Sequence, residues 1–109
     1  MSRFIIEALH KIIKEALQRE LPRTRLTLIN IRTMLKNRIH STFAKYNITF
    51  PDTSDLFGIA GRKRVENALT ELPEETRISV GQELHLLDEI SRQIMRAEQR
   101  IASVVEVTP

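Results

Sequence analysis

Leucine and isoleucine recur at intervals of three and four residues along most of this 109-residue chain. That spacing places them on one side of an α-helix, whereas a half-buried strand would need apolar and polar residues to alternate, which no segment shows. Aromatic residues make up only 5% of the chain, so Leu, Ile and Val must form the core. The sequence therefore predicts an all-α fold in which long helices pair as a helical hairpin or coiled coil.

Proline and glycine divide the chain into segments. Proline suits the first turn of a helix and not its interior, so Pro22 and Pro73 predict helix starts. We expect one helical domain over residues 1–109. Its expected parts are an N-terminal helix within 1–21, a second, basic helix over 22–46, a loop and short helix over 47–72, and a long helix over 73–105.

The long helix at 73–105 carries a seam of aliphatic residues typical of coiled coils, in which positions alternate by three and four over more than two heptads. A helix of this length spans about 50 Å, more than the roughly 35 Å diameter of a compact domain of this size. We therefore expect a homodimer, with a monomeric bundle as the alternative. Gly81 lies inside the helix and predicts a bend or a close helix crossing. The seam residues are Leu87, Ile90, Ile94, Ala97, Ile101 and Val104.

Basic residues are unevenly distributed, although the net charge is only +3. No acidic residue occurs between Glu20 and Asp52, and a second basic cluster follows at 62–64. On a helix, the basic residues at 25, 32, 36 and 40 form one polar stripe, with Arg38 on the far side. Such a stripe is typical of phosphate binding, of a solvated face, or of pairing with acidic residues elsewhere. The candidate nucleic-acid-binding residues are Arg25, Arg32, Lys36, Arg38, His40, Arg62, Lys63 and Arg64.

No catalytic, metal-binding or cofactor-binding pattern occurs in the sequence. Cysteine is absent, the three histidines are scattered, and the glycines at 58 and 61 lack the spacing of a phosphate-binding loop. The adjacent acidic pairs Glu74-Glu75 and Asp88-Glu89 do not share a helix face, so neither predicts acid–base chemistry. We expect no enzyme activity, cofactor, small-molecule substrate or membrane span, and a cytoplasmic location.

The nine-residue run Arg32–His40, Arg-Thr-Met-Leu-Lys-Asn-Arg-Ile-His, resembles a motif in the middle of the DEDD-type insertion-sequence transposases, which include the Piv-type DNA invertases and the RNA-guided bridge recombinases. Residues 23–105 are similar to that family, whereas 1–21 match poorly. The further matching stretches are Ala44–Ile48, Asp55–Gly58, Gly61-Arg62 and Leu72-Pro73.

The resemblance implies a non-catalytic role for this chain. In the family, an RNase-H-like domain with four acidic catalytic residues precedes the segment, and a domain with a catalytic serine follows it. No family catalytic residue corresponds to a position in this sequence. The resemblance therefore predicts the middle, coiled-coil part of a truncated or separately encoded transposase, which dimerises and contacts DNA or guide RNA during DNA transposition and recombination.

Two other functions fit the same residues. A helical homodimerisation module with no nucleic-acid binding would use the basic stripe only as a solvated surface. A stand-alone regulator of transposition would be encoded near a complete transposase. Salt-dependent binding to duplex DNA or structured RNA separates the first of these from a nucleic-acid-binding module.

Overall fold

The computed structural model describes residues 2–107, so Met1, Thr108 and Pro109 lie outside the described part of the chain. Its elements are the α-helices α1 (Arg3–Lys45), α2 (Ile59–Ala68) and α3 (Glu74–Val107), with a 3₁₀ turn, η1 (Leu69–Glu71), after α2. No strand occurs within residues 2–107. The expectation of an all-α fold with long helices is confirmed.

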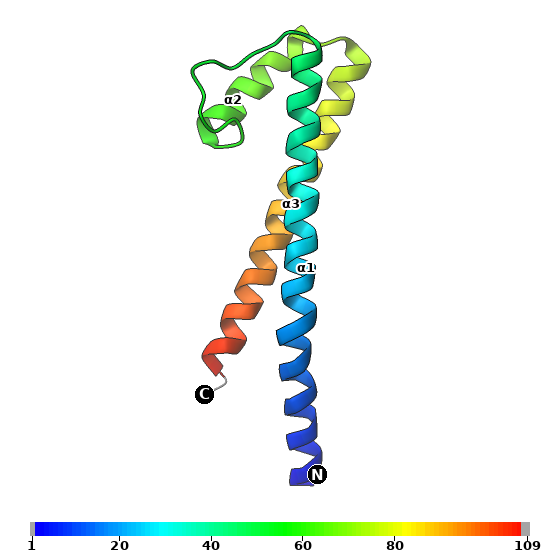
Figure 1. The fold of residues 1–109 in the computed structure, drawn as a ribbon, viewed down its shortest axis with the longest axis vertical. Coiled ribbons are helices and arrows are strands. Elements are labelled where there is room, and N and C mark those ends of the chain that lie inside the picture. The colour runs from blue at the N-terminus through cyan, green and yellow to red at the C-terminus, as the bar shows by residue number, and fades with distance from the viewer. Residues whose placement is uncertain (1, 108–109) are drawn as a thin grey trace. The chain divides into compact units, whose positions relative to one another are not determined.

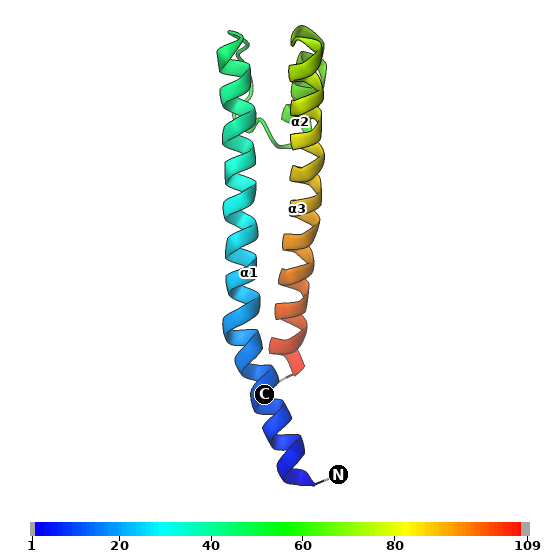
Figure 2. The same ribbon diagram turned by 90° about the vertical axis from the view of Figure 1, so that its right-hand side faces the viewer.

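The predicted break at Pro22 is wrong, because α1 continues through this residue for 43 residues. Pro22 has no N–H to donate to the carbonyl of Gln18, and its ring crowds that carbonyl, which costs about 3 kcal/mol in a helix interior. The residue is exposed, so its ring needs no space in the core. Figure 2 shows α1 bending in its N-terminal, blue part, and a bend is the usual response of a helix to an internal proline.

The end of α1 is formed by a left-handed residue, Asn47, whose φ is 59°. The Ile48 N–H donates to the Phe43 carbonyl at 3.0 Å, and the Asn47 N–H donates to the Ala44 carbonyl at 3.1 Å. These two bonds define a Schellman motif, in which asparagine is one of the few residues tolerated besides glycine. The chain leaves the helix there, close to the boundary predicted at residue 46.

Helix α2 packs against the loop before it at Gly61. A Cβ atom at this position would lie 2.2 Å from the Asp55 carbonyl oxygen and 2.5 Å from the Leu56 carbonyl oxygen. Backbone atoms cannot move aside as a flexible side chain can, so only glycine fits this close approach. Gly61 and Val65 are buried on the same side of the helix, together with Ala68.

Helix α3 begins directly after Pro73, as expected. Glu74 and Glu75 occupy its first turn, where a negative charge is favoured by the helix dipole. Gly81 does not mark a close helix crossing, because no atom beyond its own stretch of helix backbone lies within 4 Å of a Cβ built there. That part of the prediction is wrong, and the glycine exposes the helix backbone to solvent instead.

Two compact units make up the chain, and α1 and α3 each run through both. Unit 2 spans Arg32–Glu89 and contains α2 and most of the buried side chains. The expectation of one domain stays a prediction. The buried apolar residues of unit 2 are Leu35, Ile39, Phe43, Leu56, Val65, Ala68, Leu72, Val80, Leu84 and Leu87.

Unit 1 joins the N-terminal part of α1, up to Ile31, to the C-terminal part of α3, from Ile90. The two helices run in opposite directions (Figure 1). Among the side chains that the structure describes, Ile94 and Ala97 are its buried apolar residues, whereas Ile101 and Val104 are half-buried. With so few buried side chains, unit 1 is a helix pair with a narrow contact and not a bundle with a deep core.

The predicted seam of α3 is therefore buried within the chain over part of its length. Leu87 is buried in unit 2, and Ile94 and Ala97 in unit 1, whereas Ile90 is only half-buried. Val80 and Leu84 extend the buried row toward the start of α3, with the same spacing of four and three residues. Because these side chains are already covered, the seam does not by itself call for a second copy of the chain.

Candidate nucleic-acid interface

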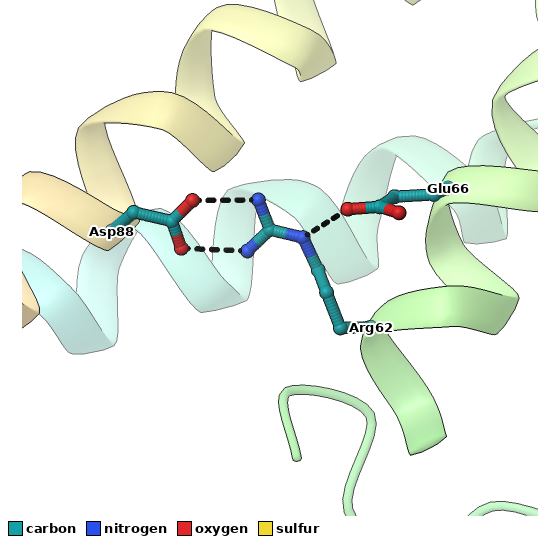
Figure 3. A network of polar contacts seen from close by, with 3 residues as sticks. All are labelled: Arg62, Glu66 and Asp88. Carbon is teal, nitrogen blue, oxygen red and sulfur yellow. Dashed lines mark hydrogen bonds and ion pairs between the residues drawn. The ribbon is translucent and has the colours of Figure 1, made fainter. Parts of the chain in front are cut away.

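Arg62, one of the candidate phosphate-binding residues, is held by two carboxylates of unit 2. Its Nη1 and Nη2 atoms donate to Oδ1 and Oδ2 of Asp88, each at 2.8 Å, and its Nε donates to Oε1 of Glu66 at 3.0 Å (Figure 3). The hydrogen bonds to Asp88 raise the pKa of Arg62, although burial acts in the opposite direction. This guanidinium therefore connects α2 to α3, and carboxylates already engage three of its five N–H donors.

Two further candidates, Arg25 and Arg38, also bind carboxylates on α3. Arg25 contacts Glu98 at 2.9 Å in unit 1, and Arg38 contacts Glu83 at 2.9 Å in unit 2. The long side chain of Arg38, predicted on the far side of its helix from the stripe, reaches α3. Pairing with acidic residues elsewhere, one of the three meanings left open by the sequence, holds for these arginines.

Lys36 and His40 lie one helical turn apart on α1 and both contact the ring of Phe57. The Lys36 Nζ is 5.4 Å from the ring centroid, and the imidazole of His40 meets the ring edge-on at 5.3 Å between centroids. A cation over an aromatic face is stabilised by the quadrupole of the ring. These two side chains thus pack the loop between α1 and α2 against α1 through Phe57.

Arg32, Lys63 and Arg64 remain from the predicted set. None of the three forms an ion pair within the described residues, and Lys63 and Arg64 are exposed. Arg64 lines a hollow of about 280 Å³ that is also bordered by Asp52 and Asp55. Two carboxylates beside this hollow oppose the entry of a phosphate, so the cluster at 62–64 is less suited to nucleic acid than the sequence suggests.

The excess of positive charge lies in unit 1, to which only Arg25 of the predicted set belongs. Unit 1 contains nine Lys and Arg against five Asp and Glu, whereas unit 2 contains eight against nine. Four of its arginines are exposed and have no carboxylate partner in the described structure. Two of them lie four residues apart on α1, and two lie four residues apart on α3, so each two are neighbours on one side of a helix. They are Arg19 and Arg23 on α1, and Arg96 and Arg100 on α3.

The spacing of the arginines on α3 could have identified them from the sequence. Arg92, Arg96 and Arg100 recur every four residues and so follow one side of α3. Because Glu98 lies between Arg96 and Arg100 in the sequence, counting charges along the chain does not reveal this row of arginines. Only the ion pair of Glu98 with Arg25 shows that this carboxylate is engaged on another side of the helix.

Metal binding and membrane insertion each require particular features of the described residues. No group of three or more metal-binding side chains occurs among the described residues. None of the described helices combines the length and the apolar character needed to cross a membrane. Comparisons with protein-family models, curated proteins and solved structures find no match for this chain.

Proposed function

We propose that this chain is a non-catalytic helical module that contacts the phosphates of DNA or structured RNA and self-associates, as a part of the machinery of DNA transposition. Nucleic-acid contact is assigned to unit 1, and the likeness of residues 32–40 to insertion-sequence transposases supplies the biological context. A cytoplasmic location belongs to the same proposal.

The observation that carries the proposal is the set of exposed, unpaired arginines on unit 1. Arg96 and Arg100 are one turn apart on α3, and neither side chain donates to a carboxylate within the described residues. Guanidinium groups in this state can form bidentate contacts with phosphate oxygens. Arg25 is engaged with Glu98 and contributes to the structure instead.

Fluorescence anisotropy with labelled duplex DNA and with structured RNA tests the proposal. We expect the dissociation constant to lie in the range of about 10⁻⁴ to 10⁻⁶ M at physiological salt and to rise steeply as salt is added. Replacing Arg96 and Arg100 with Gln removes two phosphate contacts, so the slope of log K against log salt should fall in magnitude by about 2.

A matched control is the double substitution Lys63→Gln, Arg64→Gln. It removes the same charge from unit 2, beside Asp52 and Asp55, and we expect a smaller change in affinity and slope. An equal change from both pairs would show that only net charge matters. No binding by the unsubstituted chain at low salt would overturn the nucleic-acid part of the proposal.

A helical homodimerisation module without nucleic-acid binding is the second candidate function. It is favoured by the carboxylate partners of Arg25, Arg38 and Arg62, which give three of the predicted phosphate-binding residues a structural role. This candidate predicts a stable dimer whose mass does not change when nucleic acid is added.

A further inference from the structure

The N-terminal part of α1 carries apolar side chains that nothing in residues 2–107 covers. In a helix with 100° per residue, five of them lie within an arc of about 120°. Their exposed fractions range from 43% for Ile6 to 61% for Ile12. We call this set the N-terminal apolar face: Ile5, Ile6, Leu9, Ile12 and Ile13.

Helix α3 does not reach this face. The ion pair between Arg25 and Glu98 sets the antiparallel register of α1 and α3 within unit 1. In this register, each residue toward the start of α1 lies level with one residue further toward the end of α3. Val107, the last residue of α3, is therefore level with Ala16. The N-terminal apolar face precedes Ala16 and therefore projects beyond the described part of α3, as the blue end of α1 does in Figure 2.

The area of the face approaches what a two-fold pair requires. Five aliphatic side chains at these exposures present on the order of 450 Å² of apolar surface, the size of the largest patch on a typical soluble protein, which is often functional. Two copies together would bury roughly 900 Å² before the flanking side chains are added, close to the lower limit of about 1,200 Å² for specific interfaces.

The pattern of residues favours an antiparallel arrangement of the two copies. With its midpoint between His10 and Lys11, antiparallel pairing sets Leu9 level with Ile12 of the second copy, and Ile5 level with Ala16. Ile6 then flanks the contact opposite Ile13 of the second copy, so apolar residues meet apolar residues.

Parallel pairing is disfavoured by charge. In a parallel pair of helices with this heptad register, the side chain of Glu15 would face Glu20 of the second copy across the contact. Two carboxylates in that relation repel each other, and neither has an ion-pair partner within the described residues. The antiparallel arrangement separates them.

We propose that two copies of this chain pair antiparallel through the N-terminal apolar face of α1, and not through the seam of α3. The contact is isologous, as a closed two-fold dimer requires. This inference rests on the self-association part of the proposed function and is independent of nucleic-acid contact. It specifies the interface and the direction of the partner helix.

Sedimentation equilibrium at micromolar concentration tests the interface. We expect the unsubstituted chain to have twice its monomer mass of 12.6 kDa, and the double variant Leu9→Asp, Ile12→Asp to have the monomer mass with unchanged helicity. The control variant Leu86→Asp, Met95→Asp places the same added charge on two exposed apolar residues of α3, and it should remain dimeric. A monomeric unsubstituted chain, or a dimer that survives the double substitution, would overturn the proposal.

Disulfide trapping tests the direction of pairing, because the chain has no cysteine of its own. Antiparallel pairing brings residue 5 level with residue 16, so a mixture of the Ile5→Cys and Ala16→Cys chains should form a cross-linked heterodimer on oxidation. Each variant alone should not, since its two thiols would be about 16 Å apart along the axis. Efficient cross-linking of Ile5→Cys chains with each other would show parallel pairing and contradict the proposed geometry.

Measuring the affinity of the Leu9→Asp, Ile12→Asp variant for nucleic acid separates the two proposals. A monomeric variant that still binds DNA through Arg96 and Arg100 supports the N-terminal interface and leaves phosphate contact intact. A dimeric chain that binds no nucleic acid would overturn only the phosphate-binding part of the proposed function.

Discussion

At the scale of single residues, the function of a charged or small side chain here depends on what it contacts. Arg62 and Arg64 are two positions apart in sequence, yet one is held by Asp88 and Glu66 while the other has no carboxylate partner among residues 2–107. Gly61 and Gly81 are both helical, yet one touches backbone carbonyls and the other faces open space. Residue type alone therefore does not predict the different surroundings of the two arginines or of the two glycines.

Substitution of each of these two glycines by alanine should change stability in opposite directions. Gly61→Ala forces a Cβ against two carbonyl oxygens and should lower the free energy of unfolding by about 1–3 kcal/mol. Gly81→Ala fills open space and improves helix propensity, so it should raise that free energy by about 0.5–1 kcal/mol. Urea denaturation followed by far-UV circular dichroism measures both. Equal effects of the two substitutions would contradict the close packing of α2 on its preceding loop.

A double-mutant cycle should show that Arg62 couples more strongly to Asp88 than to Glu66. The contact with Asp88 is bidentate and joins two helices, but both side chains are partly solvated, so we expect a coupling energy of only about 1 kcal/mol. The i,i+4 pair with Glu66 serves as the control and should give about 0.3–0.5 kcal/mol. Coupling to Glu66 as large as that to Asp88 would contradict a bidentate contact between Arg62 and Asp88 in solution.

At the scale of elements, α1 continues through one local stop signal and ends at another. Pro22 predicts a helix boundary, but α1 passes through it, because the residues on both sides are good helix formers and the ring faces solvent. The end of α1 instead follows its local signal, since Asn47 readily adopts the left-handed conformation. Helix ends that depend on φ are therefore easier to read from sequence than helix interiors.

Pro22→Ala tests whether α1 is continuous in solution. Restoring the hydrogen bond to the Gln18 carbonyl inside a continuous helix should raise the free energy of unfolding by up to about 3 kcal/mol and increase the helix signal. Pro73→Ala is the control, because Pro73 precedes the first turn of α3, where a missing N–H costs nothing. If Pro22→Ala changes stability no more than Pro73→Ala does, then the chain breaks at Pro22 after all.

At the scale of the whole molecule, the net positive charge and most of the exposed large apolar side chains belong to unit 1. That unit has few buried side chains, an excess of basic residues, and the exposed face near the start of α1. Unit 2 has most of the buried side chains and nearly balanced charge. We propose that unit 2 stabilises the fold and that unit 1 contacts nucleic acid and a second copy of the chain.

We expect no cleavage or joining of DNA by this chain. The sequence contains no set of acidic residues spaced for phosphoryl transfer and no position that corresponds to a catalytic residue of the transposases it resembles. Incubation with supercoiled plasmid and Mg²⁺, followed by gel electrophoresis, should show no nicked or linear product above the buffer control. Specific nicking that disappears when one residue of this chain is changed would overturn the expectation.

The sequence by itself determined the helical class, the start of α3 and the apolar row along it, because helix periodicity and the conformational limits of proline are local properties. It could not determine the partners of the charged residues. Arg25 and Glu98 are far apart in the sequence, and their contact exists only because α1 and α3 run antiparallel in one register. The same register decides which apolar side chains are covered and leaves those before Ala16 exposed, since burial depends on what lies opposite in space.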